Sequence, residues 1–227
     1  MTPDPARDIG QFPLLSGLED AVRQRAARSL RWQHFASGAI VIDRDEEQAD
    51  VHFLTRGQLL AVYWTRDGRE IIFTSMSEGN YFGELTALDG VPRSLCVYAR
   101  TAAELAIMPA AVFRELIRDS GLFRDRVLAG LTHRVRDLTE RMCQLTSLSV
   151  PDRVKAFVLR RAVQADCLRP GAVLRDFPTH AEIAAQIGAN REAVSRALSA
   201  MRQDGILRAG RGEIIIADPD GLLDQDL

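Results

Sequence analysis

The hydrophobic positions of the chain change their period along the sequence and divide it into parts. From residue 38 to residue 108, short runs rich in β-branched and aromatic residues alternate with turn residues; the runs are 38–42, 51–55, 58–65, 69–75, 95–101 and 104–108. Asp67-Gly68 lies between two of them, and this dipeptide is typical of a tight β-hairpin. Regularly spaced short strands predict a small antiparallel barrel or sandwich.

Helical patterns lie on both sides of this region. Ser16-Gly17-Leu18-Glu19 has the spacing of a capping box and predicts a short helix that ends near Leu30. After the last strand, Pro109 suits the start of another helix. From Leu122 to about Leu148 the pattern is helical throughout.

This long helix carries a narrow apolar stripe. Its members recur at spacings of four, four, three, four and three residues: Val127, Leu131, Val135, Leu138, Met142 and Leu145. A narrow stripe that persists for nearly three heptads is typical of a coiled-coil seam and predicts a dimer of two copies. The alternative is that the stripe packs against the chain's own β-rich region.

A new helix is predicted to begin at Ser149. Ser149 is a favourable N-cap, Pro151 is tolerated in the first turn, and Asp152 suits the positive end of the helix dipole. We expect an interdomain hinge here and a helix that ends near Gln164 or Cys167.

Two further helices follow. Thr179 and Glu182 form a capping box for the first, Gly188 makes the turn, and Asn190 caps the second. Two short helices joined by a glycine turn predict a helix-turn-helix, in which the second helix docks in the major groove of DNA.

The second of these helices has two distinct faces. The polar face is formed by Arg191, Glu192, Ser195 and Arg196, and the apolar face by Val194, Leu198 and Met201. Arginine pairs with O6 and N7 of guanine, and glutamate accepts from N4 of cytosine, so the polar face predicts base contacts. The alternative is an ordinary solvated helix face with an Arg–Glu pair.

A hairpin, or wing, is predicted behind this element. Its strands are residues 206–208 and 213–216, and it carries Arg208 and Arg211. Both arginines are expected to contact DNA phosphates, which position a protein on DNA without specifying sequence.

A glycine-containing segment, residues 79–94, combines chemistry suited to a nucleotide. Gly83 lets the backbone approach a ligand, and Glu84 offers a carboxylate to a sugar hydroxyl. Nine residues later, Arg93 offers a guanidinium to phosphate oxygens, to which N–H groups of a glycine turn add donors. The segment therefore predicts a site for a cyclic mononucleotide. The alternative is an ion pair between Arg93 and Glu84 within a loop.

The sequence Phe82-Gly83-Glu84-Leu85, followed by Pro92-Arg93-Ser94, resembles the phosphate-binding cassette of cyclic-nucleotide-binding domains. With the helix-turn-helix from Thr179 to Arg196, it makes the chain resemble the Crp–Fnr family of bacterial transcription regulators, in its catabolite-activator branch, over roughly residues 12–217. The resemblance implies an α+β fold: an N-terminal antiparallel β-roll in residues 1–120, a long dimerisation helix in 121–148, and a C-terminal winged helix-turn-helix in 149–227.

The resemblance also implies ligand contacts. In the cassette these are Gly83, Glu84, Leu85, Arg93 and Ser94, and on the long helix they are Arg134, Leu138 and Thr139. Glu84 matches the residue that takes the ribose 2′-hydroxyl, and Arg93 and Ser94 match those that take the cyclic phosphate. Leu138 stands where the catabolite activator has a threonine that contacts adenine. Cyclic AMP is the expected effector, and cyclic GMP is its rival.

The implied DNA contacts are Thr179, Asn190, Arg191, Glu192, Ser195 and Arg196. Of these, Arg191, Glu192 and Arg196 match the family positions that read a half-site of the TGTGA type. The expected partners are double-stranded DNA, a cyclic nucleotide, a second copy of the chain and RNA polymerase.

Composition limits the alternatives. The chain has 227 residues, 46% of them hydrophobic and 26% charged, and a net charge of −2, which argues against general coating of nucleic acid. Three dispersed cysteines and four dispersed histidines indicate no metal, haem or iron–sulfur cofactor. With neither a signal peptide nor an apolar run of ~20 residues, a cytoplasmic protein without membrane contact is expected.

Other functions remain possible from the sequence. The nearest is a regulator of the same fold that senses another effector instead of a nucleotide. An enzyme is not expected, because the chain has no G-x-S-x-G motif, P-loop or metal-ligand cluster. A protein that only makes interactions through the coiled-coil seam is a third alternative.

Overall fold

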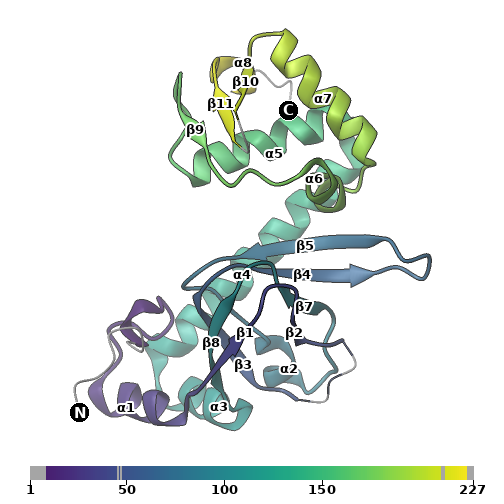
Figure 1. Cartoon of the computed structure of the whole chain (residues 1–227). Coiled ribbons are helices and arrows are strands. Elements are labelled where there is room, and N and C mark those ends of the chain that lie inside the picture. Colours follow the sequence, from purple (N-terminus) through teal and green to yellow (C-terminus); the bar gives the residue numbers. More distant parts are fainter. Residues whose placement is uncertain (1–8, 45, 47, 211–212, 224–227) are drawn as a thin grey trace. The chain divides into compact units, whose positions relative to one another are not determined.

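Figure 1 shows the computed structural model, which describes residues 9–44, 46, 48–210 and 213–223. The chain forms two compact units, residues 1–136 and 137–227, and the division falls within one long helix. Each unit is described by itself.

The first unit is built on two four-stranded antiparallel sheets, with strand orders β1-β8-β3-β6 and β2-β7-β4-β5. The strands are β1 (Arg31–Phe35), β2 (Ile40–Ile42), β3 (Val51–Arg56), β4 (Leu59–Trp64), β5 (Glu70–Met76), β6 (Tyr81–Phe82), β7 (Cys96–Ala99) and β8 (Ala103–Met108). The antiparallel β fold is confirmed. Asp67-Gly68 connects β4 to β5 in the long hairpin visible in Figure 1, and Gly68 has the positive φ, 80°, that favours glycine.

Strand β3 is buried on both of its faces. Phe53 packs with Phe12, Phe113 and Phe123 under the helices, whereas the next residue, Leu54, packs with Leu59 and other residues of the second cluster. Successive side chains of a strand point to opposite faces, so β3 joins two layers of hydrophobic core. This explains why its sequence shows a continuous apolar run rather than an alternating one.

Over residues 9–136, apart from 45 and 47, the helices that lie in or enter the first unit are α1 (Asp20–Ser29), α2 (Glu84–Asp89), α3 (Ala110–Asp119) and α4 (Gly121–Ser147). Pro109 is the N-cap of α3, as the sequence predicts. The predicted capping box at Ser16 is wrong, because Glu19 is the N-cap of α1 and no side chain caps it. Gly17 turns the chain at φ 63°, and the Ser16 carbonyl accepts a hydrogen bond from Arg126 on α4.

The described part of the second unit contains four shorter helices and a small sheet. The elements are α5 (Val150–Gln164), β9 (Val173–Leu174), α6 (His180–Ile187), α7 (Arg191–Gln203), β10 (Leu207–Ala209), β11 (Ile214–Ile216) and α8 (Asp220–Leu223), and the sheet order is β10-β11-β9. Ser149 accepts a hydrogen bond from the Asp152 N–H at the start of α5, as predicted. The wing hairpin is confirmed as β10 and β11, but Arg211 lies outside the described residues.

The predicted apolar stripe on α4 is wrong at its first residue, Val127. Val127 is 2% exposed and belongs to the core of the first unit, whereas Leu128 is 54% exposed. The exposed stripe consists of Leu128, Val135, Leu138, Met142 and Leu145, with partly buried Leu131. Starting at Leu128, its spacings alternate strictly between three and four residues. This is the heptad pattern of a coiled-coil seam, and it is more regular than the stripe counted from Val127.

Within the described ranges, no helix combines the length and the apolar character needed to cross a membrane.

Candidate functional site

Gly83 turns the chain from β6 into α2. Its φ of 87° is left-handed, and it is the N-cap residue of α2. A Cβ at this position would lie 2.5 Å from Nη1 of Arg93 and 2.8 Å from the main-chain oxygen of Asp50. Position 83 therefore requires glycine for two reasons: its left-handed backbone conformation, and the space that the Arg93 guanidinium occupies.

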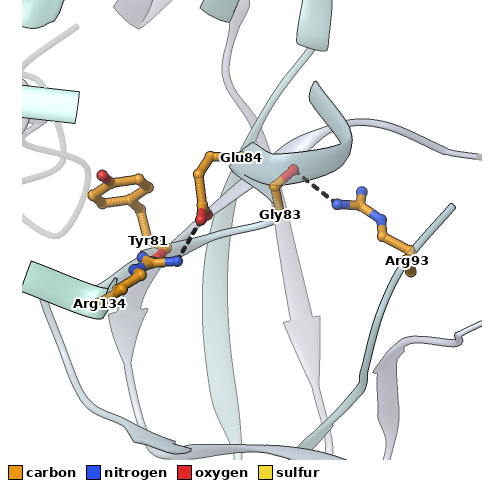
Figure 2. A network of polar contacts seen from close by, with 5 residues as sticks. All are labelled: Tyr81, Gly83, Glu84, Arg93 and Arg134. Carbon is orange, nitrogen blue, oxygen red and sulfur yellow. Dashed lines mark hydrogen bonds and ion pairs between the residues drawn. The ribbon is translucent and has the colours of Figure 1, made fainter. Parts of the chain in front are cut away.

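Glu84, the first residue of α2, is a buried carboxylate with one free oxygen. Its side chain is 1% exposed, and Oε1 accepts a hydrogen bond of 2.5 Å from Nη1 of Arg134 (Figure 2). Among the described residues, Oε2 has no hydrogen-bond partner, although it is fully buried. An unpaired buried carboxylate oxygen is costly, so this atom is an acceptor available to a ligand hydroxyl.

Arg93 is held by two main-chain carbonyls. Its Nη1 donates to the oxygen of Gly83 at 2.9 Å (Figure 2). Its Nη2 donates to the oxygen of Asp50 at 2.8 Å. The Asp50 carboxylate is in turn paired with Arg31 at 2.6 Å. A guanidinium has five N–H groups, so these two bonds fix its plane and leave three N–H groups for an anion. The Glu84 ion pair shown by the structure is with Arg134 rather than with Arg93.

Burial affects the charge balance around Arg93. It lowers the pKa of the guanidinium, while Glu46, Asp50 and Glu84 act to raise it. An arginine remains charged under these conditions, so a buried positive charge faces the glycine turn.

His52, which sequence analysis missed, lies beside this charge. It is buried, and its ring stacks on Phe82 with centroids 5.1 Å apart and an interplanar angle of 15°. Burial, helped by the positive charge of Arg93, lowers the pKa of His52 to about 4. The histidine is therefore neutral near pH 7 and adds no second cation beside Arg93.

Arg134 connects α4 to the cassette. Besides its bond to Glu84, its Nη2 donates to the main-chain oxygen of Tyr81 at 2.7 Å. Its guanidinium carbon lies 5.0 Å from the centroid of the Tyr81 ring, within the range of a cation–π contact (Figure 2). Tyr81 was not among the predicted site residues, although it precedes the predicted motif by one residue.

The other predicted ligand residues lie outside this network. Leu85 is 51% exposed on α2, and Ser94 is exposed next to Arg93 in the sequence. Leu138 and Thr139 lie on α4 beyond the division between the units, where Leu138 is 54% exposed. The structure thus brings Gly83, Glu84, Arg93 and Arg134 together.

The helix-turn-helix is held by local caps. The Thr179 hydroxyl accepts from the Glu182 N–H at 3.2 Å, and the Glu182 carboxylate accepts from the Thr179 N–H at 2.8 Å, which is the predicted capping box. Gly188 takes the left-handed conformation at φ 62°, and Oδ1 of Asn190 accepts from the Ala193 N–H at 2.7 Å.

The two faces of α7 are those that the sequence predicts. Val194, Leu198 and Met201 are buried, Arg191, Glu192 and Arg196 are exposed, and Ser195 is half-buried. Near the start of α6, burial lowers the pKa of His180, and Arg202 and Arg191 lower it further. The exposed face of α7 presents Arg191 at the positive end of the helix dipole and Arg196 further along the helix, which favours contact with phosphates.

No cluster of three or more metal-ligating side chains occurs among the described residues. The cysteines Cys96, Cys143 and Cys167 are free thiols.

The fold and the two sites define a DNA-binding transcription regulator with a cyclic nucleotide-binding domain. Residues 32–120 match the cyclic nucleotide-binding domain family, and residues 152–225 match the Crp-like helix-turn-helix domain family. The chain belongs to the Crp–Fnr family of transcription regulators.

Similar proteins support this assignment. The CRP-like cAMP-activated global transcriptional regulator of Mycobacterium tuberculosis is 27% identical over 216 residues, which cover 94% of this chain and 96% of the relative. The cAMP-activated global transcriptional regulator CRP of Escherichia coli is 26% identical over 183 residues, covering 80% and 87%. The structure of the c-di-GMP-responsive global regulator CLP of Xanthomonas campestris aligns with a TM-score of 0.73 at 20% identity, covering 88% and 100%.

Proposed function

We propose that this regulator is gated by a cyclic mononucleotide, which binds at the cassette and promotes binding of a homodimer to a palindromic operator. The observation that carries the proposal is the buried Oε2 of Glu84, which has no partner among the described residues, directly after the Gly83 turn whose carbonyl accepts a hydrogen bond from Arg93. Residues 83–94 thus offer an acceptor for a sugar hydroxyl and donors for an anion.

The ligand contacts follow from these atoms. The ribose 2′-hydroxyl donates to Oε2 of Glu84, and the cyclic phosphate accepts from the N–H groups of Arg93 that the two carbonyls leave free. Ser94 adds a hydroxyl donor, and the missing side chain of Gly83 allows the sugar to approach the backbone. Leu85 is proposed to contribute its main chain beside Glu84, and its side chain is exposed on α2.

Cyclic AMP is the proposed effector. Two relatives that align over most of this chain are described as cAMP-activated. Leu138 and Thr139 remain proposed base contacts, and the leucine offers no hydrogen bond to adenine. Cyclic GMP is therefore tested beside cyclic AMP. The likeness to CLP is at 20% identity and concerns the fold alone.

A second copy of the chain is the proposed occupant of the apolar stripe on α4. Val135, Leu138, Met142 and Leu145 are each more than half exposed. Their heptad spacing suits a parallel pair of helices, which buries this surface.

A ligand bound beside Arg134 then favours one arrangement of the two helices over others. A coupling free energy of about 1–3 kcal/mol between the nucleotide site and the DNA site corresponds to roughly 5–150-fold tighter DNA binding.

The proposed operator is a TGTGA-like inverted repeat with half-site centres about 34 Å apart. Arg191, Glu192 and Arg196 are the proposed base contacts, since all three are exposed on α7. Thr179, Asn190 and Ser195 lie at or near the helix N-termini and are proposed to contact the DNA backbone, together with Arg208 of the wing. RNA polymerase is the proposed protein partner.

Isothermal titration calorimetry with cyclic AMP, cyclic GMP and cyclic di-GMP tests the ligand assignment. We expect one site per chain for a cyclic mononucleotide in the native protein, and loss of binding in Arg93→Leu and Glu84→Gln. Arg118→Leu changes an exposed arginine on α3 and should bind normally. Native protein that binds its operator but none of the mononucleotides would contradict the proposal and favour a different effector.

A further inference from the structure

Gly130 lies in the middle of α4, where glycine disfavours a helix relative to alanine. Its backbone conformation does not require glycine, because it is part of a regular helix. The reason is space: a Cβ at Gly130 would lie 2.6 Å from the hydroxyl oxygen of Tyr81. The nearest ring atoms, Cζ and Cε1, would lie 3.7 and 3.9 Å away, which is ordinary contact. The missing side chain thus forms a notch that only the hydroxyl of Tyr81 needs.

The Tyr81 hydroxyl is buried in this notch, and among the described residues it has no hydrogen-bond partner. Burial raises the pKa of the phenol, so the hydroxyl stays neutral. A buried hydroxyl without a partner is unfavourable for stability. A phenylalanine would avoid this cost, and an alanine at position 130 would favour the helix. The chain therefore carries two locally unfavourable residues in contact with each other, which points to a role beyond packing.

Arg134 lies one helical turn after Gly130 and holds the same tyrosine. It donates to the Tyr81 oxygen, covers the Tyr81 ring and binds Oε1 of Glu84. Two successive turns of α4 thus contact Tyr81: Gly130 accommodates its hydroxyl, and the Arg134 guanidinium binds its main-chain oxygen and covers its ring. Glu84, the proposed ligand acceptor, follows Tyr81 by three residues and shares the same arginine (Figure 2).

We infer that Tyr81, seated in the Gly130 notch, is the positioning residue that couples occupancy of the nucleotide site to the position of α4. This inference rests on the proposed function. A ligand on Glu84 acts on the 81–84 segment and on Arg134, and α4 cannot slide or rotate against that segment while the hydroxyl fills the notch. A fitted notch gives α4 discrete positions rather than a continuum, as a switch requires.

The test uses a pair of substitutions that compensate each other. Gly130→Ala collides with the Tyr81 hydroxyl, whereas the double variant Tyr81→Phe/Gly130→Ala removes the colliding atom and leaves ordinary contacts. Gly121→Ala is the matched control, because a Cβ there meets only the end of the Arg124 side chain, at 3.5 Å. The readout is the ratio of operator Kd values without and with cyclic nucleotide, measured beside the Kd for the nucleotide itself.

We expect Gly130→Ala to lower this ratio by about tenfold and the double variant to restore it to within about threefold of the native value. Nucleotide affinity should change less than the ratio, which separates coupling from general damage to the site. Equal ratios in the single and double variants, or a native ratio in Gly130→Ala, would overturn the inference.

A native protein whose operator affinity ignores every cyclic nucleotide would refute the proposed function, and the coupling role with it. The notch itself is then judged by denaturant unfolding. Gly130→Ala should lower the unfolding midpoint in the native background and raise it in the Tyr81→Phe background. Equal shifts in both backgrounds would show that no such notch exists.

Discussion

The two functional regions of this protein are built in opposite ways. In the helix-turn-helix, the caps at Thr179 and Asn190 and the turn at Gly188 are fixed by neighbours within a few residues, and the proposed base-reading side chains are exposed. In the cassette, Glu84 and Arg93 are buried, and their partners come from positions as distant as Asp50 and Arg134. A locally built surface is set by its own short segment, whereas a buried long-range network connects several elements, so that a change at one of them can reach the others.

The largest effect is expected from Gly83→Ala. The new Cβ collides with Arg93 and with the Asp50 oxygen, so the guanidinium must leave its position. We expect nucleotide affinity, measured by calorimetry, to fall by about 1,000-fold or more, through lost charge-assisted hydrogen bonds and backbone strain. Gly90→Ala is the control: Gly90 has a similar φ of 72°, but a Cβ there would meet no atom within 4 Å. Comparable losses in both variants would attribute the effect to strain alone.

Helix α4 contains the boundary between the two units, and two adjacent residues near its start test its two faces. Val127→Asp places a charge in the first unit's core and should lower the free energy of unfolding by about 3 kcal/mol or more. Leu128→Asp places the charge on the exposed stripe and should leave folding almost unchanged while dissociating the proposed dimer in analytical ultracentrifugation. A native protein that sediments as a monomer would contradict the proposal that two copies pair through this stripe.

The buried His52 should make the first unit sensitive to acid. Its folded pKa is about 4 against an ordinary 6.5, so the unfolded chain takes up a proton that the folded protein refuses. Its contribution is complete above pH 6.5 and is lost as the pH falls to about 4, amounting to at most about 3 kcal/mol. Urea unfolding between pH 4 and pH 7 measures how the free energy of unfolding depends on pH. This dependence should be weaker in His52→Gln than in the control His34→Gln, because His34 is exposed.

In the DNA-reading region, Arg191→Ala should act at a single base pair. Losing a bidentate contact to guanine costs about 1–3 kcal/mol of discrimination at that position. Fluorescence anisotropy with a set of operators, each with one base pair changed, measures this discrimination. Arg191→Ala should rank the operators changed at other positions in the same order of affinity as the native protein does. A uniform loss on all sequences would instead indicate a phosphate contact. The nucleotide response should remain, because Arg191 belongs to neither the cassette nor α4.

The smallest effect is expected from Asn190→Ala, which removes the N-cap of α7. The loss in stability of the second unit should be about 1 kcal/mol, as is typical of such caps. Thermal unfolding should show it, and Asn190→Ser should recover most of the loss. A change in nucleotide affinity would be unexpected and would weaken the contrast between the two regions.

The sequence predicts the helix-turn-helix well because its determinants are local. A capping box, an N-cap asparagine, a glycine turn and a helical period are all visible within a short stretch of sequence. The box at Ser16 failed for a related reason: the pattern fits, but Gly17 takes a left-handed conformation and the helix begins only at Asp20. Short-range patterns indicate which residues can cap a helix, not which conformation the preceding turn adopts.

Several residues of the cassette site cannot be predicted from short-range sequence patterns. Gly83, Glu84 and Arg93 carry a recognisable motif, but Asp50 contributes a main-chain oxygen, which any residue possesses. His52 and Tyr81 matter through burial and stacking, and these depend on how β3, β6 and α4 meet. The heptad phase of α4 was also ambiguous, because adjacent Val127 and Leu128 are both apolar and only packing decides which one is buried. Gly130, an isolated glycine in a helical pattern, is a sequence signal that indicates the close approach of Tyr81 to α4.

The central claim is that a cyclic mononucleotide at the cassette controls DNA binding. It is tested most directly by fluorescence anisotropy of a labelled TGTGA-palindrome duplex, titrated with the native protein at one fixed salt concentration, without nucleotide and with cyclic AMP or cyclic GMP. We expect one nucleotide to tighten operator binding by roughly 5–150-fold, and we expect no such tightening in Arg93→Leu. Operator binding of equal strength under all three conditions would contradict this claim.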